Sequence, residues 1–332
     1  MLRLTPAPYI IAQIIVVKIG AIIFLTSSVA NIVISLDAGI RFGEFFVNVG
    51  MISFALILVT VVLFLGFFRE NLREEPQNVD ILLDTSAWIY VGNRALMYKS
   101  TVALVVMIIA FIVIPSSILS PDMIALTIAV ILLVTSRLKP VEIFRKVDFK
   151  LIFYLLGLFV VTGALEKVGV IDLIAAGLGG TSFGSPFGTF LFLFWISAYI
   201  SAPVDNIAIV RVFIPMTDLI TQGYSMAARH LAFYGIAFGV NLGDNIIVAS
   251  GDSLIGISVA EENQSPVNMR RISLIGFVTA NVQLFTIMTI YSLIYWWEFG
   301  LVLLIALFAI LFVIVMRKKL HAKTKTRKSL PA

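Results

Sequence analysis

The sequence contains no cysteine and only two histidines, His230 and His321. A chain without cysteine has no disulfide bond, no thiolate metal site and no cysteine nucleophile. Two histidines are too few to build a histidine cage around a metal ion. Charged residues are scarce as well, because they make up 13% of the chain, against about 25% in an ordinary soluble domain. Thiol chemistry and a histidine metal centre are therefore excluded.

Apolar residues dominate what is present: 60% of the 332 residues are hydrophobic, and the mean hydropathy is +1.05. A soluble globule of this size could not cover so much apolar surface with so few polar residues. A lipid bilayer removes the difficulty, because it is itself an apolar solvent. The composition excludes a soluble enzyme, a nucleic-acid-binding protein and a disordered linker. It predicts an all-α, polytopic protein of the cell membrane, with the lipid bilayer as its partner.

Long apolar runs predict the membrane-spanning helices, each of which needs roughly 20 residues. The run that follows Arg3 is interrupted by Lys18 and has no small-residue cleavage site, so we interpret it as mature structure and not as a signal peptide. Three stretches contain a polar cluster near the middle and predict broken helices: residues 7–36, 187–220 and 231–260. Uninterrupted runs predict continuous spans at residues 45–68, 101–119, 123–134, 151–165, 272–295 and 301–315.

The distribution of positive charge predicts the topology. Of the 24 lysines and arginines, 18 lie in four segments, at residues 69–99, 136–150, 260–271 and 317–332, and such segments face the cytoplasm. For the sides to alternate, residues 187–220 must enter and leave on the outer face. Their first arm, residues 187–200, is about 21 Å long as a helix and does not cross a hydrocarbon core of roughly 30 Å. We therefore expect a re-entrant hairpin at residues 187–220.

An internal repeat is visible at a shift of 223 residues. Lys18-Ile19-Gly20 aligns with Asn241-Leu242-Gly243, and Ser27 aligns with Ser250. A polar loop and a long span follow each copy, and the charge count gives the two copies opposite orientations. Inverted repeats with broken helices are typical of secondary transporters.

Polar residues at the predicted breaks are the candidate site, because an interrupted helix in lipid persists only where it lines a cavity or a site. Residues 201–205 are typical of a helix start, with Pro203 in the first turn and Asp205 where the dipole favours an acid. Charges at bilayer depth usually mark ion or proton pathways. The candidate binding residues are Lys18, Ser27, Ser28, Asn31, Asp205, Asn206, Asn241, Gly243, Asp244, Asn245, Ser250, Gly251, Asp252 and Ser253.

Several of these residues also have a purely structural interpretation. The three aspartates could cap helices inside the protein. Arg211, a candidate counter-ion, could pair with Asp205 or with Asp218. Lys18 could extend to the cytoplasmic surface. His230 is more typical of an interfacial residue than of a proton relay.

Three tracts resemble the ion transporter superfamily: residues 149–169, from Phe-Lys-Leu-Ile-Phe to Gly-Ala-Leu-Glu-Lys-Val-Gly, the hairpin tip at 201–206, and residues 239–253. The resemblance covers residues 5–312. It is stronger to arsenite permeases and NhaD-type sodium/proton antiporters than to citrate and dicarboxylate carriers. It implies two inverted repeats, each with a re-entrant hairpin and a broken helix that meet at a site in the middle of the membrane. It also implies ion coupling and a homodimer.

The sequence departs from that family at its start. It begins at the first broken helix, so the N-terminal part of the first repeat is expected to be missing from the gene model, or to be replaced by a partner or a second copy. Lys18-Ile19-Gly20-Ala21 stands where the family often has Asn-Ile-Gly-Gly. The expected parts are the end of the first repeat (1–68), a cytoplasmic linker (69–100), a second repeat (101–297), a final span (298–316) and a basic cytoplasmic tail (317–332).

The leading hypothesis is a secondary active transporter of an inorganic ion or small oxyacid, such as arsenite, antimonite or Na⁺, coupled to H⁺ or Na⁺ and without a further cofactor. Asp205, Asp244 and Asp252 would bind the cation or exchange protons. Like charges repel in a low dielectric, so three carboxylates disfavour citrate or a dicarboxylate, which stay as alternative substrates with other anions. Lys18 could supply the charge of a bound Na⁺ and leave this half independent of sodium.

Two other classes of function stay open. A non-transporting or partner-dependent membrane subunit would fit the missing N-terminal part. An intramembrane aspartyl protease would need Gly-x-Gly-Asp, whereas Asn241 and Ala249 occupy the first position of the motif before Asp244 and Asp252. We therefore expect the protein not to be an enzyme.

Overall fold

The computed structural model describes residues 6–69, 71–73, 88, 91–114, 118–136, 138–147, 149–170, 173, 185–246, 251–262 and 267–328. Every regular element in these ranges is helical, and they contain no β-strand. Four of the described helices are long and apolar enough to cross a membrane: Phe42–Phe67, Arg94–Val113, Met269–Tyr295 and Trp297–Ile314. The prediction of an all-α protein with several membrane-spanning helices is confirmed.

The chain divides into two compact units, of which the smaller consists of Met1–Leu4, Arg41–Gly43 and Glu75–Gly157. Lys99 Nζ donates a hydrogen bond of 2.7 Å to the carbonyl of Thr135 and joins two of its helices. Apolar side chains such as Val102 and Val134 are exposed on them, which suits a surface covered by lipid. The helices of this unit are α6 (Arg94–Val113), α7 (Pro121–Ser136), α8 (Pro140–Phe144) and the first part of α9 (Phe149–Lys167).

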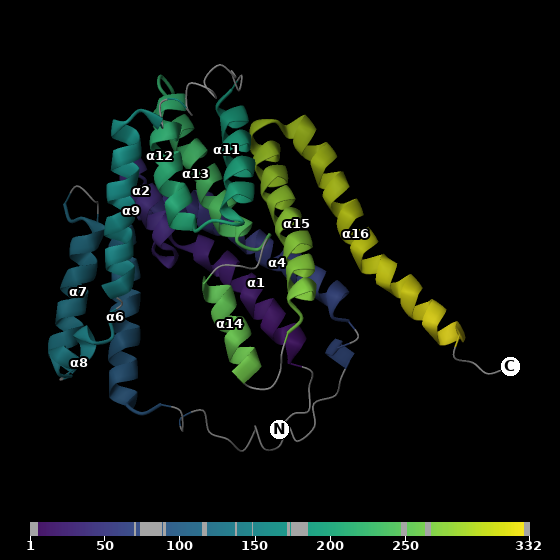
Figure 1. Ribbon diagram of the computed structural model, residues 1–332, viewed down its shortest axis with the longest axis horizontal. Coiled ribbons are helices and arrows are strands. Elements are labelled where there is room, and N and C mark those ends of the chain that lie inside the picture. The colour runs from purple at the N-terminus through teal and green to yellow at the C-terminus, as the bar shows by residue number, and fades with distance from the viewer. Residues whose placement is uncertain are drawn as a thin grey trace. The chain divides into compact units, whose positions relative to one another are not determined.

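The larger unit consists of Thr5–Ile40, Glu44–Glu74 and Leu158–Ala332. Figure 1 draws α11, α12 and α13 side by side in this unit. Its principal helices are α1 (Ala7–Ile23), α2 (Val29–Ala38), α4 (Met51–Phe67), α11 (Pro186–Ser201), α12 (Asn206–Ile220), α13 (Met226–Gly243), α14 (Gly251–Glu262), α15 (Met269–Tyr295) and α16 (Trp297–Lys328). Shorter elements are η1 (Leu25–Ser27), α3 (Phe42–Phe45), which begins in the smaller unit, the π-helical η2 (Phe46–Gly50) and η3 (Asn71–Arg73).

Each stretch predicted to be broken forms two helices. Residues 24–28 separate α1 from α2, residues 202–205 separate α11 from α12, and α13 ends at Gly243 while α14 begins at Gly251. One detail of the prediction is wrong, because Pro203 lies in the turn before α12 and not in its first turn. Asp205 is the N-cap: its side chain accepts hydrogen bonds from two backbone N–H groups and fixes the helix start at the following residue.

The two broken helices run antiparallel along each other. The carbonyl of Ala38 at the end of α2 lies 3.2 Å from His230 Nε2 near the start of α13. Farther back on α2, Asn31 bonds to Asn241 near the end of α13. The other halves, α1 and α14, also pack on each other. The two breaks therefore lie beside each other in the middle of this arrangement.

Three glycines on α13 let it approach α11 closely. A Cβ atom added to Gly235, Gly239 or Gly243 would lie 2.9 Å, 2.5 Å or 2.2 Å from the carbonyl oxygens of Phe190, Phe194 and Ala198, respectively. The spacing of four residues on both helices keeps this contact along one face. Small residues at such spacing allow close backbone packing between helices in membranes. This glycine stripe, Gly235, Gly239 and Gly243, places the α11–α12 turn at the end of α13.

Candidate functional site

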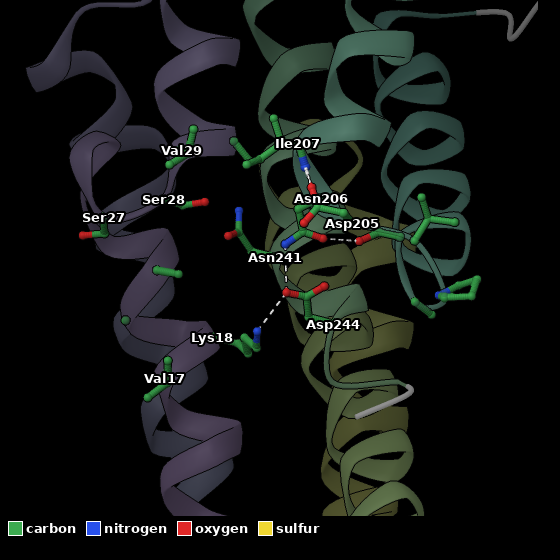
Figure 2. A pocket seen from close by; sticks show the side chains of 17 residues that line it. Val17, Lys18, Ser27, Ser28, Val29, Asp205, Asn206, Ile207, Asn241 and Asp244 are labelled. Atoms are coloured by element: carbon green, nitrogen blue, oxygen red, sulfur yellow. Dashed lines mark hydrogen bonds and ion pairs between the residues drawn. The ribbon is translucent and has the colours of Figure 1, made fainter. Parts of the chain in front are cut away.

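A pocket of about 660 Å³ lies where the three helix breaks come together. Figure 2 shows two walls: α1, η1 and the start of α2 form one, while the α11–α12 turn and the end of α13 form the other. The volume is within the range of pockets that hold small molecules. The polar residues that line it are Lys18, Ser27, Ser28, Ser201, Asp205, Asn206, Asn241 and Asp244.

An ion pair between Lys18 and Asp244 connects the two walls (Figure 2). Lys18 Nζ lies 2.9 Å from Asp244 Oδ2, and the two side chains are only 5% and 11% exposed. Asn206 Nδ2 donates a hydrogen bond of 2.8 Å to the same oxygen, so α1, α12 and α13 meet at one atom. Two charges removed from water need such pairing, because burial costs several kcal/mol per ion. Lys18 therefore does not extend to the membrane surface.

Two buried asparagines join other helix ends behind the ion pair. Asn31 is fully buried and donates 2.8 Å from Nδ2 to the carbonyl of Ala21. Its Oδ1 accepts a hydrogen bond of 2.9 Å from Asn241 Nδ2, which also donates to the carbonyl of Ala237. The last carbonyls of a helix lack partners within it, and Asn31 supplies one to the end of α1. The amides thus hold the two breaks together.

Two helix N-termini face the pocket with different surroundings. At α12, Asp205 Oδ1 accepts a hydrogen bond of 2.9 Å from the N–H of Ile207, so a carboxylate covers the positive end of the helix dipole. At α2, Ser28 precedes the helix but makes no side-chain hydrogen bond to it. Val29 and Ala30, the first residues of α2, line the pocket. One terminus is therefore neutralised, while the other offers its electropositive end.

Residues 1–240 of the chain match the citrate transporter family, CitMHS. The chain belongs to this family. It is accordingly a multi-pass membrane transporter and not an enzyme, and the alternative of an intramembrane protease is set aside. The resemblance to the ion transporter superfamily is confirmed, and the family that matches is the one of citrate transporters.

Several known proteins are similar to this chain. An uncharacterized transporter of Mycobacterium tuberculosis is 24% identical over 298 residues, which are 89% of this chain and 68% of the relative. The arsenical pump membrane protein of Escherichia coli is 21% identical over 269 residues, or 80% of this chain and 62% of that protein. Magnetosome protein MamN of Magnetospirillum gryphiswaldense is 26% identical over 247 residues, or 72% and 54%. The chain thus spans about two thirds or less of their length.

In this citrate transporter family member, seven of the fourteen candidate residues line the pocket: Lys18, Ser27, Ser28, Asp205, Asn206, Asn241 and Asp244. Four others lie away from the lining. Asn31 is behind it, Gly243 packs against Ala198, and Ser253 is buried. Asn245 is also buried and donates 3.3 Å to the carbonyl of Ile15. Ser250 lies outside the described residues, and Gly251 and Asp252 are described only as the first two residues of α14.

The candidate counter-ion is placed elsewhere as well. Arg211 lies on α12 but does not line the pocket. Asp218, one of its two expected partners, forms its ion pair with Arg229, with Nη2 2.7 Å from Oδ1. One carboxylate oxygen of Asp205 accepts the hydrogen bond that caps α12. Asp205 therefore caps α12, as the structural interpretation expects, and also lines the pocket.

Sequence reasoning missed two features of this region. Ser201 lines the pocket and lies 2.9 Å from the carbonyl of Val240, which ties the hairpin tip to α13. A polar cluster around Glu44 and His230 was missed altogether, because 186 residues separate its two central side chains. The interpretation of His230 as an interfacial residue did not foresee its burial, since it is 5% exposed.

Proposed function

We propose that the chain is a secondary active transporter that moves a small ion or oxyacid through this pocket, coupled to H⁺ or Na⁺. The observation that carries the proposal is the buried Lys18–Asp244 pair on the wall of the pocket. The carboxylate of Asp244 can release the ammonium group of Lys18 and bind a cation or a proton in its place. Charged groups at such depth in membrane proteins commonly lie on ion or proton pathways.

The arrangement of the broken helices supports an inverted-repeat topology. The antiparallel run of α1–α2 against α13–α14 is what two copies of opposite orientation give. The hairpin arms α11 and α12 have 16 and 15 residues, so each is about 24 Å long or less and does not cross a core of roughly 30 Å. We propose a first repeat that ends at residue 68 and a second repeat at 101–297, which contains a re-entrant hairpin at 187–220. A cytoplasmic linker at 69–100 joins the repeats, and a final span at 298–316 and a cytoplasmic tail at 317–332 follow.

The charge of the pocket lining favours a cation or a neutral oxyacid. One ammonium group, on Lys18, stands against the carboxylates of Asp205 and Asp244. A tricarboxylate would be repelled by the excess negative charge in a low dielectric. Arsenite in its undissociated form, antimonite or Na⁺ fits this balance. Lys18 occupies the place of a monovalent cation beside Asp244, so we propose that it replaces a bound Na⁺ in this half.

Citrate or a dicarboxylate is the second candidate, and one observation favours it. The N-terminus of α2 has no side-chain cap and lies in the lining beside the hydroxyl groups of Ser27 and Ser28. Such an electropositive end attracts carboxylates. The family name points the same way. We further propose a homodimer, as the resemblance to ion transporters implies, and a monomeric mass by light scattering in detergent would contradict it.

Proton flux in proteoliposomes tests the proposed function. The purified chain is reconstituted with a trapped pH dye, and Na⁺, Li⁺, arsenite and citrate are pulsed in turn. We expect a pH change with Na⁺ and Li⁺ or with arsenite, and none in protein-free liposomes. A response to citrate alone would support the second candidate. Silence to all four pulses, from protein that is folded by circular dichroism, would contradict transport by this chain alone and favour a partner-dependent subunit.

A further inference from the structure

A second cluster of titratable side chains lies outside the pocket lining. Glu44 on α3 faces His230 near the start of α13, with Oε1 2.5 Å from Nδ1. Tyr234, one turn farther along α13, donates a hydrogen bond of 2.8 Å to the same carboxylate oxygen. About 16 Å of helix separate His230 from Asn241 at the pocket. The cluster is therefore a separate site on the same helix.

The hydrogen bonds of the imidazole show where its protons lie. His230 Nε2 is 3.2 Å from the carbonyl of Ala38. A carbonyl only accepts hydrogen bonds, so Nε2 must carry hydrogen. Nδ1 faces a carboxylate oxygen, and two lone pairs at that distance would repel each other. One further proton therefore lies between His230 and Glu44, either on the imidazole or on the carboxyl group.

The two members of the pair differ in how far they are exposed. The imidazole side chain is 6% exposed, whereas the Glu44 side chain is 27% exposed. The proton is therefore less shielded on the side of Glu44 than on the side of His230. Other titratable groups on the elements packed around the pair are Asp37 on α2, Arg211 and Asp218 on α12, Arg229 on α13, and Arg270, Arg271, Tyr291 and Tyr295 on α15. Arg229 is neutralised by its ion pair with Asp218.

A π-helical segment holds the cluster in place. Asn48, inside η2, donates 2.9 Å to the carbonyl of Glu44, and its own carbonyl accepts a hydrogen bond of 2.8 Å from Tyr291. Asn48 Nδ2 also lies 3.5 Å from the hydroxyl of Tyr234. Gly50 ends the segment where a Cβ would lie 2.3 Å from the carbonyl of Ile23. Single π-helical turns often occur at functional sites.

We propose that Glu44 and His230 form a second proton-binding site, apart from the pocket, which exchanges its proton with water through Glu44. Its ligand is the proton itself. With the proton bound, the imidazole joins the end of α2, through the carbonyl of Ala38, to the side chain of Glu44. The proposal does not depend on the proposed transport function, since the proton can be observed in the purified protein.

Nuclear magnetic resonance of ¹⁵N-labelled histidine tests the site. The substitution His321→Gln leaves His230 as the only histidine in the chain, so every histidine signal reports on this site. Near neutral pH we expect hydrogen at Nε2 and a shared proton at Nδ1. In Glu44→Gln on the same background, we expect loss of the Nδ1 proton and the signals of a single neutral tautomer.

A matched control separates the shared proton from general packing. Tyr234→Phe removes the hydrogen bonds of the phenol to Glu44 and from Asn48 but leaves both members of the pair in place, so the Nδ1 proton should stay. Thermal unfolding of each variant shows whether it is folded. If Glu44→Gln does not fold, the parent spectrum decides by itself. A bare Nδ1 near neutral pH in the protein with Glu44 intact would overturn the proposal, whatever the transport assay shows.

Discussion

Replacing Asp244 with asparagine should abolish coupled flux and destabilise the protein by about 3–5 kcal/mol, because it removes the carboxylate that pairs with the buried ammonium group of Lys18. The pair is held at 2.9 Å with both side chains shielded from water. Asn206 would also lose a charged acceptor. Flux is measured in proteoliposomes with a trapped pH dye, and stability by thermal unfolding of the purified protein in detergent.

Two further variants separate folding from coupling. The double variant Lys18→Asn with Asp244→Asn removes both charges, so it should regain most of the stability but show no coupled flux. Lys18→Asn alone should make flux depend on added Na⁺, if the lysine replaces that ion. Asp218→Asn is the matched control: it breaks an ion pair whose side chains are 29% and 39% exposed, and such pairs contribute about 1 kcal/mol or less. Normal coupled flux in the folded double variant would contradict a role for Asp244.

The substitution Gly239→Leu should prevent α11 and α13 from packing and lower the yield of folded protein severely. A Cβ at this position would lie 2.0 Å from Ser197 Oγ and 2.5 Å from the carbonyl of Phe194. The hydroxyl can rotate away, but the backbone carbonyl cannot, so the helices must separate. Overpacking in a tight contact costs about 1–3 kcal/mol and more where backbone must move. Thermal unfolding and size-exclusion chromatography measure the effect.

Gly157→Leu is the control for that substitution. A Cβ at Gly157 on α9 meets nothing within 4 Å, and leucine is a better helix former than glycine by up to about 1 kcal/mol. Its stability should therefore be unchanged or higher. Equal melting temperatures for Gly239→Leu and Gly157→Leu would show that the α11–α13 contact does not depend on the glycine stripe.

The sequence predicts the helix breaks well, because polar clusters inside apolar runs are local signals. The polar tip at 201–206 and the tract after Gly239 both coincide with real ends of helices. The start of α12 was misplaced, since Pro203 and Asp205 are both typical of a first turn or cap and only the backbone decides between them. The small-residue spacing of Gly235, Gly239 and Gly243 is also visible in the sequence, although its partner helix is not.

Pairings between distant residues could not be predicted. Lys18 and Asp244 were both recognised as charges at bilayer depth, but 226 residues separate them and nothing local shows that they meet. Glu44 lies between two apolar runs and resembles an ordinary loop acid, and His230 resembles an interfacial residue. The packing of both α2 and η2 on α13 brings these two together. Tertiary geometry, and not composition, creates both of these side-chain pairs.

Cysteine accessibility in the pocket tests the central proposal, transport through this pocket, most directly. The chain has no cysteine, so Ser28→Cys introduces a single thiol in the lining, and Val61→Cys on α4, where valine is 49% exposed, is the control outside it. We predict that a membrane-impermeant methanethiosulfonate reagent modifies Cys at position 28 and blocks the proton flux driven by Na⁺, Li⁺ or arsenite, while flux through the control is unchanged. Complete modification at position 28 with undiminished flux would contradict transport through this pocket.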